Sequence, residues 1–315
     1  MSDAALDPDI YLGMRDLMAL EGAVQGLSFG ARQAVGSVLA GQHGSRLRGR
    51  GLDFQELRRY LPGDDLRQLD WRASMRFGKP YVRAYGEERD RPVLVVVDQR
   101  MGMFFGSRRS FKSVVAGRLA ALAAWMAYRA GDRVGGLVIG DDGIDSVRPL
   151  RSRTRIQALF AAIVRRNRAL SARRPDQDEA GLLNRTLEQA LSMAPHDCLL
   201  CIISDFAGAD AQTLRLLRLL AEHNDVVATL VYDPLALAVP AHGTLVVTQG
   251  ELQVELQVER ERVRQPLAEL FSGRLREVAQ LLRRSRLPLL SIDTEGDTAG
   301  QLRRELGRHA QRRRP

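Results

Sequence analysis

Two acidic residues stand directly after runs of apolar residues that have the character of buried strands. Asp98 follows Val93–Val97, and Asp205 follows the run CLLCIIS, which ends at Ser204. Open α/β sheets bind ligands beyond the carboxyl ends of their strands, so both carboxylates would face one crevice if these strands are neighbours. The alternative is that each acid only caps the helix that follows it, since Asp is favoured at that position. The residues alone leave both interpretations open.

Other residue types that commonly carry catalysis lack the spacing that catalysis requires. The histidines are scattered, with no nearby nucleophile and no metal-ligand spacing. Lys112 follows Gly106 by six residues, but the Gly-Lys-Ser/Thr ending of a phosphate-binding loop is missing. No glycine-rich dinucleotide fingerprint follows a strand either. The sequence therefore does not predict an enzyme.

Elements that would position the two acids can be predicted from residue 92 onward, where apolar runs alternate with segments of helical spacing. The runs expected to be strands lie at 93–97, 132–140, 198–204, 225–232 and 287–292. The segments expected to be helices lie at 113–131, 153–166, 180–193, 209–223 and 265–284. This alternation predicts the α/β class, with a mostly parallel sheet, helices on both faces and right-handed crossovers.

A charged segment precedes this α/β region. Residues 52–91 contain eight acidic and nine basic residues, and this near balance favours a network of ion pairs over a phosphate-binding patch. Trp71 is expected to anchor the segment to the sheet or to a partner. We divide the chain into an N-terminal helical segment, 1–50, a charged module packed on the main domain, 51–91, and an α/β domain, 92–315.

The charged module also carries a family resemblance. Residues 51–98 resemble the signature of the bacterial domain-of-unknown-function 58 (DUF58) family, and the segments FGSRRSFKS and GDRVGGLVI match as well. The matching positions in the module are Phe54, Arg58, Tyr60, Pro62, Gly63, Asp64, Asp65, Arg67, Asp70, Trp71, Arg83 and Glu88. The resemblance implies a von Willebrand factor A-like (Rossmann-type) domain with an extra N-terminal element.

The same resemblance implies a function and partners. Proteins of this family are typically encoded beside MoxR-type AAA+ ATPases, which implies joint action in assembling or maturing other proteins. By this resemblance we expect a non-enzymatic adaptor whose partners are a MoxR-type ATPase and a client protein. The residues expected to bind partners are Asp98, Arg100, Asp205, Asp64, Asp65, Arg67, Asp70 and Trp71.

The metal site of a von Willebrand A domain is matched only in part. That site holds Mg²⁺ through Asp-x-Ser-x-Ser, a distant Thr and a second Asp. Asp98 and Asp205 match the two acids, but Arg100 and Gly102 stand at the serine positions, and DEAGLLN supplies no Thr. A guanidinium a few ångströms from a divalent cation would repel it by several kcal/mol. We therefore expect Arg100 to pair with Asp98 or Asp205, in a degenerate site with no metal and no cofactor.

A retained Mg²⁺ site is the alternative to this degenerate site. Asp98 and Asp205 would then be metal ligands, and Ser107 or Ser110 could donate a hydroxyl oxygen if the loop folds back. Such a site would serve a metal-dependent adhesion module or a hydrolase. Because two-metal hydrolases need several acids in one pocket, a further carboxylate would come from Asp64, Asp65 or Asp70.

The net charge of +9 raises a different alternative, nucleic-acid binding. The basic region from Arg148 to Arg174 carries nine arginines and no acid, and clusters of this kind can bind phosphates. No aromatic stacking motif or zinc-ligand spacing accompanies it. A solvated, arginine-rich helix surface explains the cluster better, so we do not expect nucleic acid as a partner.

Hydropathy and cysteine content bear on the compartment. Hydrophobic residues make up 45% and charged residues 27% of the 315 residues, and no apolar run reaches the ~18 residues of a membrane helix. The N-terminus lacks the basic start and apolar stretch of a secretory signal, so we expect a cytoplasmic protein.

Cys198 and Cys201 lie in an expected strand, where residues three apart face opposite sides, and they are predicted to be packed core thiols.

Overall fold

The computed structural model describes residues 6–27, 52–60, 67, 69–87, 91–171, 181–237, 244–249, 252–257, 261–285 and 287–311. The chain forms two compact units, one comprising residues 1–36 and 91–315 and the other residues 37–90. We call the first the α/β unit and the second the signature module. Residues 28–50, which complete the predicted N-terminal segment, lie outside the part that the structure describes.

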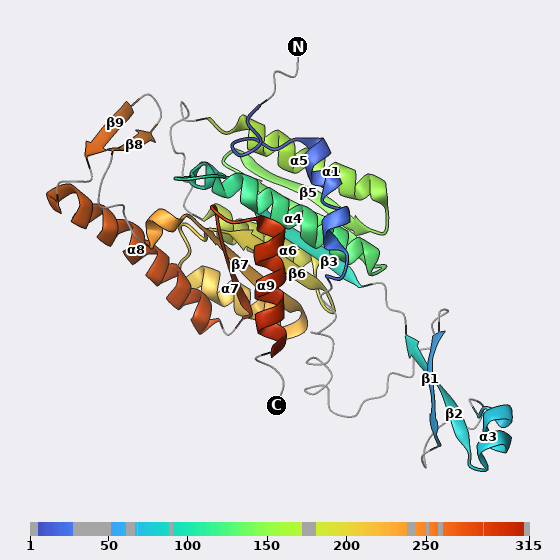
Figure 1. The fold of residues 1–315 in the computed structure, drawn as a ribbon. Helices are drawn as coiled ribbons and strands as arrows, with labels where there is room; N and C mark the ends of the chain where they lie inside the picture. Colours follow the sequence, from blue (N-terminus) through green and yellow to red (C-terminus); the bar gives the residue numbers. More distant parts are fainter. Residues whose placement is uncertain are drawn as a thin grey trace. The chain divides into compact units, whose positions relative to one another are not determined.

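The α/β unit is built around a six-stranded sheet with the order β10-β7-β6-β3-β4-β5 (Figure 1). Its strands are β3 (Pro92–Asp98), β4 (Arg133–Gly140), β5 (Gly143–Leu150), β6 (Leu199–Ser204), β7 (Asp225–Tyr232) and β10 (Leu289–Asp293). All neighbouring strands are parallel except β4 and β5, which form an antiparallel hairpin at one edge. The predicted α/β class with a mostly parallel sheet is confirmed.

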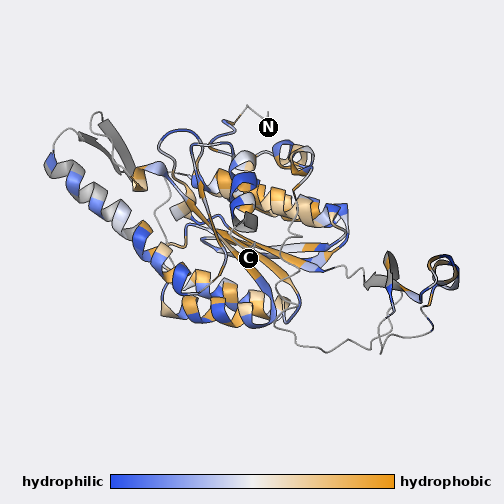
Figure 2. Cartoon of the chain, turned by 60° about the horizontal axis from the view of Figure 1, so that its bottom comes forward, coloured by the Kyte–Doolittle hydropathy of each residue, from blue (hydrophilic) through white to orange (hydrophobic). Residues whose placement is uncertain are grey.

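Helices cover both faces of this sheet. One face packs against α1 (Met14–Ala19), α4 (Lys112–Arg129), α5 (Arg153–Ala169) and α9 (Thr298–Gln311). The other face packs against α6 (Leu182–Met193), α7 (Ala211–His223) and α8 (Glu261–Arg284). Figure 2 shows the strands as predominantly apolar between these helical layers. A strand buried on both sides is apolar at every position rather than at alternate ones, which explains the uninterrupted run in β3.

The two cysteines show how one strand serves both cores. Cys201 packs on the side of α4, whereas Cys198 packs on the side of α6 and α7, and each is 3% exposed. Both are free thiols. The prediction of packed core thiols on opposite faces is confirmed, because a strand alternates its side chains between its two faces.

The N-terminal stretch is part of the core of the α/β unit. Within residues 6–27, the described part of the predicted N-terminal helical segment, the helical elements are α1 and a 3-10 turn, η1 (Gly22–Val24). Leu17 is fully buried, and its carbonyl accepts a hydrogen bond from Trp125 Nε1 at 3.0 Å. Gly117 of α4 lies directly against Leu12, where any side chain would clash. The segment therefore packs against α4 and α5.

The remaining elements are small. The signature module contains β1 (Leu52–Arg59) and β2 (Tyr81–Glu87), which pair antiparallel, and the short helix α3 (Trp71–Phe77). After the main strands, β8 (Thr244–Gln249) and β9 (Leu252–Gln257) form a separate hairpin, whereas β10 joins the main sheet beside β7. Two 3-10 turns, η4 (Met101–Met103) and η5 (Pro234–Ala236), follow β3 and β7.

Candidate functional site

The two acids singled out in the sequence lie at the topological switch point of the sheet. β3 pairs with β4 on one side and with β6 on the other, and the helices that follow β3 and β6 cover opposite faces. Asp98 is the last residue of β3, and Asp205 comes directly after β6. Because β3 and β6 are neighbours, the condition on which the predicted crevice depended is met, at the kind of location where open α/β sheets bind ligands.

Arg100 donates to both carboxylate oxygens of Asp98. The Nε atom lies 3.0 Å from Oδ1 and the Nη2 atom lies 2.8 Å from Oδ2, which is the two-pronged geometry of a charge-assisted pair. The backbone N–H of Arg100 also donates to Oδ1, at 3.0 Å. Asp98 is 0% and Arg100 is 7% exposed. Asp98, one of the two partners that the sequence left open for Arg100, thus forms an ion pair with it.

Ser204 extends this ion pair into the neighbouring strand. Its hydroxyl donates to Oδ2 of Asp98 at 2.6 Å and accepts from the backbone N–H of Phe206 at 2.8 Å. Arg100 Nη2 also donates to the carbonyl of Ala207 at 3.2 Å. The loops after β3 and β6 are thus joined by buried hydrogen bonds around one carboxylate.

Asp205 has a cation of its own, Lys112, at the start of α4. Lys112 Nζ lies 2.5 Å from Oδ2, and the backbone N–H of Ala207 donates to Oδ1 at 2.9 Å. Both side chains are 13% exposed. Burial by itself would raise the pKa of Asp205, but the charge and hydrogen bond of Lys112, the N–H of Ala207 and the charge of Arg100 outweigh it and lower the pKa. Asp205 is therefore held as a carboxylate.

Neither acid caps the helix that follows it. α7 begins after Asp210, whose carboxylate accepts from the N–H of Thr213 at 2.8 Å while the Thr213 hydroxyl accepts from the N–H of Asp210 at 3.0 Å. α4 begins after Phe111, which has no side-chain cap. The capping alternative for Asp98 and Asp205 is therefore wrong, and both acids are used for ion pairs.

The groups around Asp98 do not fit a bound Mg²⁺ ion. A carboxylate offers about four acceptor positions, and those of Asp98 take donors from the backbone N–H, Nε and Nη2 of Arg100 and from the hydroxyl of Ser204. A guanidinium at hydrogen-bond distance would also repel a divalent cation. Among the residues that the structure describes, no group of three or more His, Cys, Asp or Glu side chains could hold a metal ion.

A buried polar network, which no pattern in the sequence indicates, supports the site from the side of α4 and α5. Gln99, between the paired residues, donates through Nε2 to the carbonyl of Ser113 at 2.8 Å. Its Oε1 accepts from Nδ2 of Asn167 at 3.2 Å, and Oδ1 of Asn167 accepts from the N–H of Leu12 at 2.7 Å. The N-terminal stretch is thereby connected to the residue next to Asp98.

A third acid at a strand end, Asp233, was not predicted from the sequence. It follows β7, is 4% exposed, and accepts from the N–H and hydroxyl of Ser107, from the hydroxyl of Thr294 at 2.6 Å and from the N–H of Leu235 at 2.9 Å. The run DVVATLVYD has the same form as VLVVVD, an apolar strand ending in an acid. This pattern could have identified Asp233.

Ser107 and Ser110, the two serines whose hydroxyl oxygens could have been metal ligands, form hydrogen bonds with other acids. Ser107 is held by Asp233, and the hydroxyl of Ser110 donates to Asp9 Oδ1 at 2.5 Å. The backbone N–H groups at the start of α4 are bonded as well, Phe111 to the carbonyl of Asp9 and Lys112 to that of Phe105, both at 2.8 Å. A phosphate-binding loop would offer such groups to its ligand, whereas these two are bonded within the chain.

The site residues predicted in the signature module lie in a different unit. Asp70 is the N-cap of α3 and accepts from the N–H of Ala73 at 2.9 Å. Trp71 and Arg67 are exposed. Asp64 and Asp65 lie outside the described residues, so their predicted roles are not addressed by the structure.

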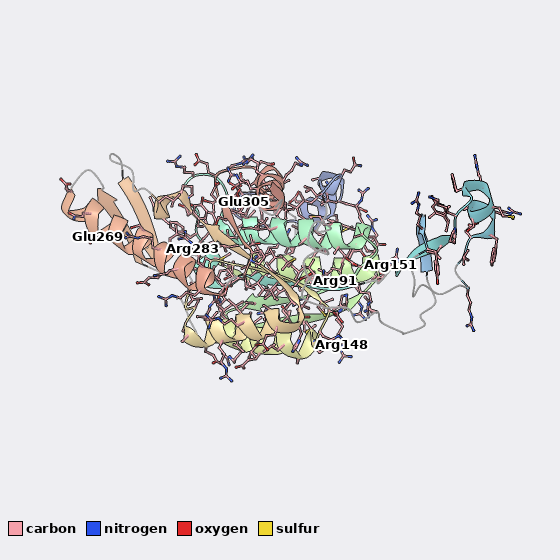
Figure 3. All side chains as sticks on the ribbon, turned by 90° about the horizontal axis from the view of Figure 1, so that it is seen from below. Arg91, Arg148, Arg151, Glu269, Arg283 and Glu305 are labelled. Carbon is pink, nitrogen blue, oxygen red and sulfur yellow. The ribbon has the colours of Figure 1, made fainter. Side chains whose placement is uncertain are left out.

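The arginines between residues 148 and 168 have mixed surroundings. Arg148 and Arg151, labelled in Figure 3, are exposed. Arg153 and Arg165 are also exposed, but they pair with acids of this chain, Arg153 with Glu21 and Arg165 with Asp145, each at 2.7 Å. Arg166 also pairs with Asp145, at 2.6 Å. Part of the positive charge expected for nucleic-acid binding is therefore neutralised by the chain's own acids; residues 172–180 lie outside the described part.

The chain belongs to the DUF58 family. The family model described as "Protein of unknown function DUF58" matches residues 56–273, which confirms the resemblance found in the signature. Uncharacterized proteins of Mycobacterium bovis and of Mycobacterium tuberculosis are 29% identical to this chain over 292 residues, covering 92% of this chain and 90% of theirs.

Two solved structures also resemble this chain. The conserved hypothetical protein BatB from Bacteroides thetaiotaomicron matches with a TM-score of 0.41 and 12% identity, over 70% of this chain and 99% of that one. An aerotolerance-related membrane protein from Bacteroides fragilis matches with a TM-score of 0.37 and 9% identity, over the same shares. Among the described helices of this chain, none combines the length and apolar character needed to cross a membrane.

Proposed function

We propose that this chain is a non-enzymatic adaptor for protein–protein interaction that works with a MoxR-type AAA+ ATPase in protein assembly or maturation. The partner performs the ATP hydrolysis, and the adaptor acts in the cytoplasm on a client protein. The family resemblance supports the kind of partner. The observation that carries the proposal is the buried pair of Asp98 and Arg100 at the switch point of the sheet.

The pair matters because of what it replaces. In a metal-dependent site of the von Willebrand A type, the cation neutralises the Asp of the first strand and bridges to a carboxylate of the partner. Here the positive charge comes from Arg100, at 2.8 Å and 3.0 Å from the two oxygens of Asp98. The pair of Asp98 and Arg100 is then neutral without a metal ion, so a partner would bind at this edge of the sheet independently of metal.

Arg100 is among the residues that the sequence predicts to bind partners, but it is 7% exposed, and its guanidinium is bonded to Asp98 and to the carbonyl of Ala207. Its role in the proposal is therefore to hold the loops after β3 and β6 in one arrangement. Preorganised loops reduce the entropy that a partner must remove on binding.

A hydrolase is less well supported than an adaptor. Hydrolysis by metal ions needs carboxylates that are available to the metals, whereas Asp98 holds Arg100 and Asp205 holds Lys112. These four side chains form two ion pairs at the edge of the sheet.

The adaptor function is tested by calorimetry with the purified ATPase encoded in the same genome. We expect the wild-type protein to bind, and Arg100→Lys to bind about tenfold more weakly, because lysine keeps the charge but loses the two-pronged geometry. Arg151→Lys, at an exposed arginine of the same unit, is the matched control and should bind as the wild type does. Absence of binding by the wild-type protein, with and without ATP, would refute the proposal.

The degenerate site is tested separately by titrating Mg²⁺ and Mn²⁺. The wild-type protein should bind neither ion at the switch point, and Arg100→Ser should gain binding because it removes the guanidinium and restores a hydroxyl ligand. Adding Asp98→Ala to Arg100→Ser should abolish the gain. Tight binding by the wild type that is lost in Asp98→Ala would instead favour a metal-dependent adhesion module or hydrolase.

A further inference from the structure

The short helix α3 of the signature module exposes large apolar side chains. Trp71 is 68% and Met75 is 77% exposed, and residues four apart on a helix are neighbours on one face. The opposite side of α3 is used within the module, since Ala73 is buried and the hydroxyl of Ser74 accepts from the N–H of Tyr81 at 2.8 Å. Trp71 and Met75 are not part of these contacts with the hairpin, whereas Phe77, which is also exposed, packs on Tyr81 with the ring centroids 5.2 Å apart.

A basic column runs beside this apolar column. Arg72 and Arg76 are both exposed and are also four residues apart, and Lys79 follows the helix. The segment from Trp71 to Pro80 contains no acidic residue. The outer face of α3 thus combines an aromatic ring, a flexible thioether side chain and guanidinium groups, and Trp, Met and Arg are enriched where proteins bind one another.

We propose that this face, which we call the α3 face and which consists of Trp71, Arg72, Met75 and Arg76, binds an acidic segment of a partner protein. The apolar column would cover apolar side chains of that segment, and the basic column would pair with its carboxylates. This inference rests on the proposed function only in assuming a protein partner, and it adds the chemistry by which the partner is recognised.

Charge decides between an acidic segment and a second copy of this chain. A symmetric dimer through the α3 face would place Arg72 and Arg76 of one copy against the same residues of the other, because a twofold interface is made of identical surfaces. Like charges brought together at an interface are unfavourable and disfavour such a partner. An acidic segment meets the same face with the opposite charge.

The size of the α3 face favours a protein segment over a lipid surface. Helices that lie on membranes are amphipathic over many residues and bury a continuous apolar face, whereas α3 has seven residues. A short face with one aromatic anchor is suited to one pocket-sized contact, and stable protein interfaces bury about 800 Å² per partner in total. We therefore expect the α3 face to provide only part of a larger interface.

The fluorescence of Trp71 offers a direct test in the full-length protein. The chain has two tryptophans, and Trp125 is 0% exposed whereas Trp71 is 68% exposed. Quenching by acrylamide, measured on the wild type and on Trp71→Phe, isolates the contribution of Trp71. The probe is a synthetic helical peptide with leucines along one face flanked by glutamates; its counterpart with lysines replacing the glutamates is the control peptide.

We expect Trp71 to be accessible to acrylamide in the free protein and to be shielded by the glutamate peptide but not by the lysine peptide. Arg72→Glu combined with Arg76→Glu should weaken peptide binding at least tenfold. Arg151→Glu combined with Arg155→Glu is the matched control, because these are also exposed arginines four residues apart, and it should bind the peptide as the wild type does. Unchanged thermal unfolding would show that the variants are folded.

Three results would overturn the proposal. Shielding of Trp71 in the free protein would mean that this chain covers its own α3 face. Shielding by vesicles of phosphatidylcholine and phosphatidylserine, without shielding by the glutamate peptide, would identify a membrane surface. No shielding by the peptide would exclude an acidic segment. Since none of these measurements uses the ATPase, failure of the α3 face and failure of the adaptor function are distinguishable.

Discussion

The switch point of the α/β unit and the α3 face both carry arginine, and they use it in opposite ways. At the switch point, Arg100 is 7% exposed and each cation is bonded to an acid of the same chain. On α3, Arg72 and Arg76 are exposed beside Trp71 and Met75. Buried charges have to be paired because leaving them unpaired in a medium of low dielectric is costly, whereas exposed charges remain hydrated and available to a partner. The ion pairs at the switch point therefore stabilise the arrangement of its loops, whereas the exposed charges of the α3 face are suited to recognition.

The largest effect is expected from breaking the buried pair. Arg100→Met keeps most of the side-chain volume but leaves Asp98 unpaired, which should lower the free energy of unfolding by about 3 to 5 kcal/mol. Urea denaturation followed by circular dichroism measures this change. Asp98→Asn combined with Arg100→Met should recover most of the loss, because no buried charge is then left; a double variant as unstable as the single one would contradict the argument.

A smaller effect with a defined pH dependence is expected from Lys112→Met. Its removal deprives Asp205 of a charged hydrogen-bond donor, which should lower the free energy of unfolding by about 1.5 to 3 kcal/mol at neutral pH. The pKa of Asp205 is lowered in the folded wild-type protein, so its contribution is fully present above the unfolded pKa of about 3.9. It is lost as the pH falls through the lower folded pKa.

The difference between Lys112→Met and the wild type should accordingly shrink under acid conditions. Urea denaturation at a series of pH values measures it, with Lys79→Met, at an exposed lysine, as the control. A difference that stays constant from neutral to acid pH would show that Lys112 stabilises the fold by packing rather than through the charge of Asp205.

In the signature module, the largest single effect is expected at the cap of α3. Asp70→Ala removes the acceptor for the N–H of Ala73 and should destabilise the module by about 1 kcal/mol. The fluorescence of Trp71 is measured during heating, as the difference between the protein with Trp71 and the protein with Trp71→Phe. This signal reports on the unfolding of the module separately from that of the α/β unit. Asp70→Asn should restore most of the stability, because asparagine is also a good N-cap.

The smallest effect on stability is expected on the α3 face itself. Arg72→Met should change the free energy of unfolding by no more than about 0.5 kcal/mol, in contrast with the same substitution at Arg100. A large loss of stability in Arg72→Met would mean that this arginine supports the fold, and the contrast between the two regions would then fail.

Much of the fold followed from short-range patterns. β3 and β6 were predicted because their apolar runs are too long and too continuous for strands with one solvated face, and both cores confirm this. The family was recognisable because its signature is contiguous in the sequence. In contrast, residues 14–27, part of the predicted N-terminal helical segment, fold into a short helix and a 3-10 turn, and glycines interrupt the helical spacing between Ala19 and Leu27.

In the candidate site, too, some features follow from the local sequence and others depend on the tertiary structure. The sequence by itself established that acids end the apolar strands and that Arg100 is close enough to Asp98 to pair with it. It could not establish that Lys112 pairs with Asp205, 93 residues away, or that Ser204 donates to Asp98 across 106 residues. Nor could it show that Asp233 joins the loops carrying Ser107 and Thr294. Which charge meets which depends on the order of strands in the sheet, and that order results from packing both faces at once rather than from any local preference.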